Sequence, residues 1–267
     1  MLVLLSPAKN MNFDPAPDAP PATRPVFLKE AREIAALARE LSPAKLKKLM
    51  SISDKLAALN HQRFAAFRGD GKSNLQKPAA LAFNGDVYLG LDAKTMTPAD
   101  FAFAQDHLRI LSGLYGLLRP LDAIEPYRLE MGSSLNSPRG RNLYDFWGKA
   151  IALEINRTLK GCKRKVVINL ASSEYFSAVD VKALDAEVIA PAFKDEKDGK
   201  LRALQFFAKR ARGSMARWIV DNRIDEPEAV KKSAADGYRF RAGESTATEW
   251  LFTRSQPPLK NARLSSD

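Results

Sequence analysis

One segment of the chain places hydroxyl groups and a carboxylate directly after an expected strand. The run Val166–Leu170 is typical of a buried central strand, and it is followed by Ser172, Ser173, Glu174 and Tyr175. Sites in α/β proteins usually lie at the carboxyl ends of strands. The serine hydroxyls could therefore bind a phosphate, and Glu174 could act as a general acid or base. The same residues could instead cap a helix, and no His lies nearby to favour a Ser-His-Asp triad.

Two loop-like segments supply further carboxylates and an arginine. The first contains Asp86 and Tyr88, and the second contains Arg128 and Glu130, which could simply pair with each other. If these carboxylates converge with Glu174 in one pocket, they suit acid–base work on a glycosidic bond. This hypothesis of a base-excising hydrolase fails if Glu130 and Glu174 lie far apart. Its candidate catalytic residues are Asp86, Glu130, Ser172, Glu174 and Tyr175.

A pair of glycines predicts a different kind of site. Gly113 and Gly116 permit left-handed backbone and close approach of a ligand, and we expect a helix before them, from Thr97-Pro98 through Leu108 to Leu111. This pattern predicts a helix-hairpin-helix turn, whose amide groups grip a backbone phosphate without reading bases. The alternative is an αα-turn in which the glycines serve only sterics. The candidate DNA-binding residues in and beside the turn are Ser112, Gly113, Tyr115, Gly116, Arg109 and Arg119.

A second cationic feature is the expected helix Lys209–Asn222. Ala211, Met215 and Ile219 fall on its apolar face together with Trp218. The opposite face carries a row of cations without an acid between them, which predicts a phosphate-binding stripe, although a solvated helix face is the commoner reason for such a row. The candidate DNA contacts here are Lys209, Arg210, Arg212 and Arg217, to which we add Lys9 and Arg128.

Composition limits the classes of site. The chain has 267 residues and a net charge of +11, from 42 Lys and Arg against 31 Asp and Glu, which favours polyanionic partners. Its one Cys and two His exclude a Cys/His zinc site with four ligands, Cys-ligated iron–sulfur clusters and disulfide frameworks. We expect no cofactor and no resident metal. Weak iron binding by carboxylates such as Asp86 and Glu130 is a further hypothesis.

The sequence also predicts where the protein acts. A single Cys fits a reducing cytosol, and no apolar run approaches the roughly 20 residues that span a bilayer. The apolar start ends at Pro7 and is too short for a signal peptide. We expect a cytoplasmic protein without a membrane partner. Cys162 lies in the cationic segment Lys160–Lys165, which we interpret as a surface loop rather than the site of a catalytic thiol.

The elements that must position these residues interleave along the chain. We expect strands at 1–5, 166–170, 187–190 and 201–207, a terminal hairpin from 238–241 and 249–254, and helices at 28–41, 44–52, 55–67, 98–111, 142–159 and 209–222. No composition break divides them. The sequence therefore predicts one mixed α/β domain over 1–254, a compact globule with a mixed β-sheet surrounded by helices, and a tail over 255–267.

Several of these segments together resemble one known family. The segments run in the same order as in the bacterial YaaA peroxide-stress family, from Met1 to about Arg254, and comprise Ser6–Lys9, Gly85–Tyr88, Leu111–Gly116, Leu118–Asp122, Pro126–Gly132, Asn169–Ser172, Glu174-Tyr175, Lys209 and Ala211–Gly213. The chain departs from the family where Asn10 and Asn12 replace a threonine and an acid, so a role that needs that hydroxyl or carboxylate does not carry over.

The resemblance implies a fold and a function. It implies a single cantaloupe fold and a protein induced by hydrogen peroxide, which helps keep unincorporated iron low and limits Fenton damage to DNA and protein. It also implies DNA binding through a positively charged cleft and a helix-hairpin-helix, by position Ser112–Gly116. No established enzymatic activity comes with the family. We accordingly expect a monomeric, non-enzymatic protein that binds duplex or distorted DNA with little sequence preference. The alternative is a nucleic-acid- or nucleoside-acting hydrolase.

Overall fold

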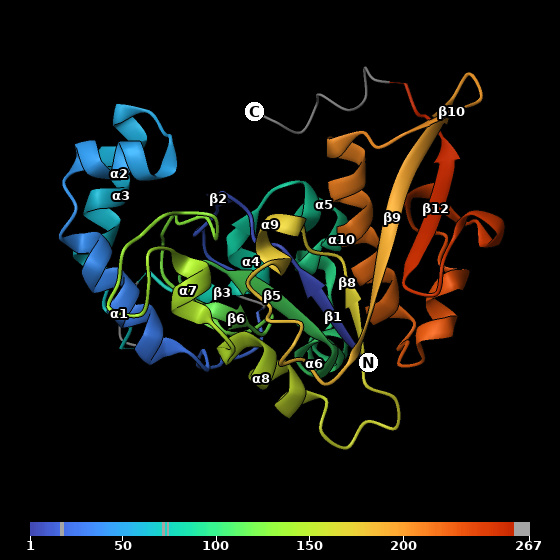
Figure 1. Cartoon of the computed structure of the whole chain (residues 1–267), viewed down its shortest axis with the longest axis horizontal. Coiled ribbons are helices and arrows are strands. Elements are labelled where there is room, and N and C mark those ends of the chain that lie inside the picture. Colours follow the sequence, from blue (N-terminus) through green and yellow to red (C-terminus); the bar gives the residue numbers. More distant parts are fainter. Residues whose placement is uncertain (17–18, 71–72, 74, 259–267) are drawn as a thin grey trace.

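A computed structural model describes residues 1–16, 19–70, 73 and 75–258 of the chain. Its centre is an eight-stranded mixed sheet of strand order β11-β12-β9-β8-β1-β5-β6, with β10 paired to β9 (Figure 1). The five adjacent strands β12, β9, β8, β1 and β5 are parallel to one another, whereas β6, β10 and β11 each pair with a neighbour in antiparallel orientation. The strands are β1 (Leu2–Leu5), β5 (Leu108–Ser112), β6 (Gly116–Leu118), β8 (Val166–Asn169), β9 (Glu187–Lys197), β10 (Lys200–Arg202), β11 (Arg239–Phe240) and β12 (Glu249–Ser255). The predicted mixed α/β class is confirmed.

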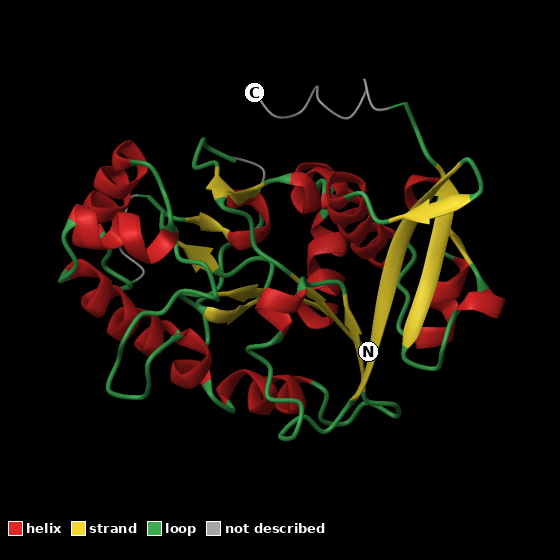
Figure 2. Ribbon diagram, turned by 45° about the horizontal axis from the view of Figure 1, so that its top comes forward, coloured by secondary structure: helices red, strands yellow, loops and turns green. Residues whose placement is uncertain are grey.

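Helices surround this sheet, as Figure 2 shows. They are α1 (Leu28–Arg39), α2 (Pro43–Met50), α3 (Asp54–Ala66), α4 (Ala79–Ala82), α5 (Asp86–Leu91), α6 (Pro98–His107), α7 (Leu143–Trp147), α8 (Ala150–Thr158), α9 (Ser173–Phe176) and α10 (Gln205–Asp221). Short 3-10 helices are η1 (Ala93–Thr95), η2 (Pro227–Lys232), η3 (Ala235–Gly237) and η4 (Ala242–Glu244). Two small sheets pair β2 (Asn10–Met11) with β4 (Phe83–Asn84) and β3 (Lys77–Pro78) with β7 (Ala123–Ile124).

The strands and helix starts with the strongest local signals form as predicted. All four residues of β1 are buried, and so are the first three of β8, as expected of parallel strands covered on both faces. Helix α6 packs against β1 and β5, and α10 against β1 and β9. Ser42 and Ser53 cap α2 and α3 by accepting hydrogen bonds from the amides three residues later.

The predicted helix-hairpin-helix is wrong, because the chain forms a β-hairpin there. Helix α6 ends at His107, and the next five residues are all buried and form β5, which pairs antiparallel with β6. An unbroken buried run suits a strand covered on both faces better than a helix with one solvent face. Gly116 supplies the left-handed turn, with φ +67°. The two glycines therefore serve a turn between strands.

Three other expectations need correction. The helix expected over 142–159 is two helices, α7 and α8, because the chain turns at Gly148, where φ is +46°. The strand expected over 201–207 ends at Arg202, and α10 already begins at Gln205. Strand β9 extends to Lys197, well beyond the expected 187–190. Most of the expected tail, 259–267, lies outside the described residues, and Ser255 still belongs to β12.

Two glycines allow α5 and α10 to lie in unusually close contact. A Cβ at Gly213 of α10 would lie 1.7 Å from the carbonyl oxygen of Val87, and a Cβ at Gly90 of α5 would lie 2.2 Å from that of Arg210. Neither position tolerates a side chain without a backbone shift. This contact fixes the start of α5, which carries Asp86, against the middle of α10, which carries Lys209.

We therefore expect Gly213→Ala to destabilise the protein despite the better helix propensity of alanine. Overpacking against backbone should lower the free energy of unfolding by about 2 kcal/mol or more, as measured by urea denaturation. Gly243→Ala is the matched control, since no atom lies within 4 Å of its added Cβ. Equal stability of the two variants would contradict the close contact.

Candidate functional site

The carboxyl ends of three parallel strands meet at one edge of the sheet. Ser6 follows β1, Ser112 ends β5, and Ser172 lies just beyond β8. The amide of Ser172 donates to Ser6 Oγ over 2.8 Å, and Ser6 Oγ donates to Ser172 Oγ over 3.3 Å. This is the edge where open α/β sheets place their sites, and the sequence predicted it from the residues after β8. Helices α5 and α9 lie beyond the ends of these strands in Figure 1.

Glu130 is held between two cations at this edge. Lys9 Nζ lies 3.1 Å from one carboxylate oxygen, and Arg128 Nη2 donates to the other over 3.0 Å. The Arg128 side chain is 16% exposed, and its buried Nε has no hydrogen-bond partner. The expected pairing of Arg128 with Glu130 is therefore present, yet it leaves one guanidinium donor free.

A third cation reaches the same place from α3. Burial and the nearby charge of Arg128 lower the pKa of Arg63. Two guanidinium groups thus lie near each other, and one of them pairs with Glu130. Sequence reasoning missed Arg63, because nothing in its own segment distinguishes it from other cations on helix surfaces and only the fold brings it here.

Glu174 and Tyr175 come from α9, on the other side of Glu130. Glu174 Oε1 accepts a hydrogen bond from the amide of Gly132 over 3.1 Å. Burial raises the pKa of Tyr175, and the Tyr127 phenol and the carboxylates of Glu174 and Glu130 raise it further. Both carboxylates are therefore close enough to act on one phenol. Glu174 also contacts the backbone two residues after Glu130, so the two carboxylates lie in the same region of the molecule, and their use in a hydrolysis stays a hypothesis.

Asp86 begins α5 beside the loop that follows β1. A Cβ at Gly85 would lie 3.1 Å from the Cβ of Ala8, and the Tyr88 hydroxyl donates to the carbonyl of Ser6 over 3.0 Å. Burial raises the pKa of Asp86, and the positive charge of Lys209 on α10 partly opposes that rise. Asp86 therefore keeps its proton to higher pH than an ordinary carboxyl group and lies near the charge of Lys209.

We refer to these side chains as the carboxyl-edge cluster: Ser6, Lys9, Arg63, Asp86, Arg128, Glu130, Ser172, Glu174, Tyr175 and Lys209. The cluster combines cations, hydroxyl groups and carboxylates. The carboxylates differ in environment, because Glu130 is paired with cations whereas burial raises the pKa of Asp86. Such a set can bind an anion by charge-assisted hydrogen bonds, and it holds the acid and base that a hydrolysis would need.

The predicted phosphate cradle in the Gly113–Gly116 turn is not at the surface. Ser112 Oγ lies 2.6 Å from the Tyr127 hydroxyl and accepts from the amide of Tyr115, and the Trp147 indole donates to the carbonyl of Gly113. Ser112, Gly113, Tyr115 and Gly116 are all buried. These groups stabilise the hairpin from within and have no access to DNA, so this part of the predicted interface is wrong.

The cations of the predicted stripe on α10 do not form one exposed row, because other parts of the fold pair with or bury most of them. Arg217 donates to Asp221 over 2.7 Å and to Thr95 Oγ1 over 2.6 Å, and Arg210 Nε lies 3.7 Å from Asp236. Burial lowers the pKa of Arg212, whose buried Nε has no partner. Only Lys209 is an exposed cation without an ion pair among the four.

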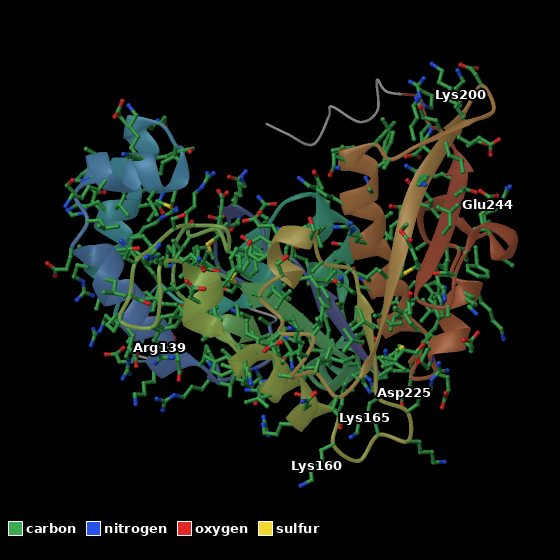
Figure 3. All side chains as sticks on the ribbon, viewed as in Figure 1. Arg139, Lys160, Lys165, Lys200, Asp225 and Glu244 are labelled. Carbon is green, nitrogen blue, oxygen red and sulfur yellow. The ribbon has the colours of Figure 1, made fainter. Side chains whose placement is uncertain are left out.

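Lysines lie on well-separated parts of the molecule. In Figure 3, Lys160 and Lys165 lie at the bottom and Lys200 lies at the upper right. Lys165 pairs with Asp185, and Arg139 pairs with Glu33. Many surface cations thus form ion pairs with acids from other elements, and the order of charges along the sequence does not reveal these pairs.

The hypothesis of direct iron binding gains no geometric support. Among the described residues, no group of three or more His, Cys, Asp or Glu side chains could hold a metal ion. Glu130 is instead paired with two cations, and Asp86 lies near Lys209. Within the same part of the chain, no helix has both the length and the apolar character needed to cross a membrane.

Comparison with known proteins gives consistent matches over nearly the whole chain. A family model described as peroxide stress protein YaaA matches residues 1–244. A UPF0246 protein of Caulobacter vibrioides is 52% identical over 257 residues, covering 96% of this chain and 100% of the relative. UPF0246 proteins of Maricaulis maris and Saccharophagus degradans are 54% and 48% identical, each over 96% of this chain and 97% and 100% of the relative.

The raised pKa of Asp86 predicts the pH dependence of a variant. Ionised Asp86 is less favourable in the folded than in the unfolded chain, so it lowers stability increasingly as pH rises past the ordinary carboxyl range. Asp86→Asn cannot ionise. We expect its stability relative to the natural protein to increase between about pH 3 and pH 7 in urea denaturation. A difference that stays constant or falls over this range would contradict the assignment.

Proposed function

Since the chain belongs to the peroxide stress protein YaaA family, we propose that it protects DNA during hydrogen peroxide stress by binding phosphates of a nucleic-acid strand at the carboxyl-edge cluster. Binding is chiefly electrostatic and has little sequence preference. Its contribution to low unincorporated iron is indirect, because the carboxylates at this edge already face cations of the protein.

One observation carries the proposal. Lys9 and Arg128 both pair with the single carboxylate of Glu130, and Arg63 lies close enough to Arg128 for that charge to lower the pKa of Arg63. The Lys9 side chain is exposed and that of Arg128 is partly exposed, and a phosphate oxygen is an acceptor of the right charge for their outer donors. Lys209 adds an exposed cation beside the same edge.

A salt titration of DNA affinity tests this site. Removing two phosphate contacts should reduce the slope of log affinity against log salt by about 2. We expect this for the double variant Lys9→Ala and Lys209→Ala, measured by fluorescence anisotropy with a short duplex.

The matched control removes the same charge elsewhere. Lys45 and Lys48 are exposed on α2 and lie outside the cluster, so the double variant Lys45→Ala and Lys48→Ala should retain nearly the full slope. If the slope falls equally in the two double variants, DNA binding depends on the overall charge of the protein and the proposed site is rejected.

A second candidate function is base excision, and the convergence of carboxylates favours it. The charges of Glu130 and Glu174 both raise the pKa of the Tyr175 phenol, and burial raises the pKa of Asp86, which therefore holds its proton more tightly than an ordinary carboxyl group. A protonated Asp86 could donate to a leaving base while one carboxylate activates water, which cleaves the glycosidic bond and adds water across it.

Product analysis separates the two candidates. If the protein is a hydrolase, chromatography should detect free base released from DNA or nucleosides, and Asp86→Asn should reduce release by about 100-fold or more. If it only binds DNA, no base is released, and Asp86→Asn leaves DNA bound with at least the natural affinity because a negative charge has gone.

A further inference from the structure

A separate pocket beside β5 and β6 is lined by arginines. It has a volume of about 290 Å³, and its charged lining consists of Arg24, Arg109, Arg119 and Arg157 with Asp106, Asp122 and Glu154. None of these residues belongs to the carboxyl-edge cluster. The pocket therefore requires an explanation of its own.

Two of the three acids are already fully engaged. Asp122 is 1% exposed and accepts hydrogen bonds from Arg119 Nε and Nη2 at 3.1 and 2.9 Å, and from Thr23 Oγ1 at 2.7 Å. Glu154 accepts two hydrogen bonds from Arg157, at 2.7 and 2.6 Å. These pairs hold Arg119 and Arg157 in place. Arg109 lies near the charges of all three acids, and Asp106 is the lining acid that has no ion pair among the described residues.

Arg109 is the unusual member of the lining. Its residue is only 7% exposed, and Nη1 donates to the carbonyls of Gln105 and Leu108 over 2.6 and 2.8 Å. Nε and Nη2 have no hydrogen-bond partner among the described residues. Burial lowers the pKa of Arg109 to about 10, and the charge of Arg119 contributes, so the guanidinium is still charged at neutral pH. Neither Nε nor Nη2 is among the buried side-chain atoms without a partner, so both are accessible from the pocket and can donate to an anion there.

The remaining side chains are suited to such an anion. Arg24 is an exposed residue of the lining, and its side chain has no hydrogen bond or ion pair with any residue that the structure describes. Asp106 is also exposed and likewise has no hydrogen bond or ion pair within that part of the chain. The guanidinium groups of Arg24 and Arg109 carry one positive charge more than the carboxylate of Asp106 balances. This leaves a positive excess in a small concave space, and guanidinium groups bind phosphate in a bidentate geometry.

We propose that this pocket binds a small dianionic phosphate, with Arg109 as the buried donor and Arg24 as the donor at the mouth. The shared chemistry is a terminal phosphate group, which inorganic phosphate and a nucleoside monophosphate both offer. A duplex offers only diester phosphates within a continuous backbone, so the pocket is independent of the proposed DNA site. Asp106 competes with the ligand for the same donors.

Isothermal titration with inorganic phosphate and with adenosine monophosphate tests the proposal on the full chain. We expect saturable binding of at least one of them. Tighter binding of the monophosphate would identify a nucleotide ligand, and equal or weaker binding would identify free phosphate. The absence of saturable binding of either at millimolar concentration would overturn the proposal.

Three substitutions assign the binding to this pocket without removing a buried residue. Arg24→Ala should weaken phosphate binding by about tenfold, and it keeps the backbone carbonyl that accepts from Arg119. Asp106→Asn should strengthen binding by about threefold, because it removes the competing charge. Lys48→Ala, an exposed cation on α2, should change nothing.

The same variants distinguish this inference from the proposed function. Arg24→Ala should reduce DNA affinity no more than Lys48→Ala does, whereas the DNA site depends on Lys9 and Lys209. If Arg24→Ala and Asp106→Asn both leave phosphate affinity unchanged, the phosphate binds elsewhere and the pocket assignment is wrong. That result would leave the carboxyl-edge proposal unaffected.

Discussion

The parallel pairing of β1 with β5 and β8 is the constraint on which the rest of the site depends. It brings the ends of three strands, far apart in sequence, to one edge, where the Ser172 amide donates to Ser6 Oγ. The loop that follows β1 carries Lys9, and helix α9, which follows β8, carries Glu174. The contact between α5 and α10 then adds Asp86 and Lys209 from a second direction. No single segment could form the cluster alone.

The sequence predicted what depends on local pattern. The β-branched run of β8 and the polar residues after it indicated a site at the end of that strand, and the helices expected at 44–52 and 55–67 form as α2 and α3. The glycine pair at 113 and 116 was misread, because glycine permits a tight turn between strands as readily as between helices. The burial of β5 on both faces, which decides between them, depends on the complete sheet.

Charge was the least predictable property. The row of cations on α10 has no acid within it, yet Arg217 finds Asp221 just beyond it and Arg210 approaches Asp236 of η3. Arg63 joins Arg128 from a helix that precedes it by more than sixty positions. Cations that share a segment can therefore be neutralised separately, while cations from distant segments gather around one carboxylate. Position in the fold, and not the net charge of +11, decides which cations are candidates for the proposed phosphate contacts.

Lysine footprinting by acetylation in the presence and absence of duplex DNA tests the central claim most directly. Lys9 and Lys209 are both exposed and chemically accessible, and Lys48, Lys160 and Lys200 are exposed cations on other parts of the surface. Strand binding at the carboxyl edge predicts that DNA protects Lys9 and Lys209 and leaves the other three reactive. Protection of Lys160 or Lys200 with Lys9 and Lys209 still reactive would contradict the account.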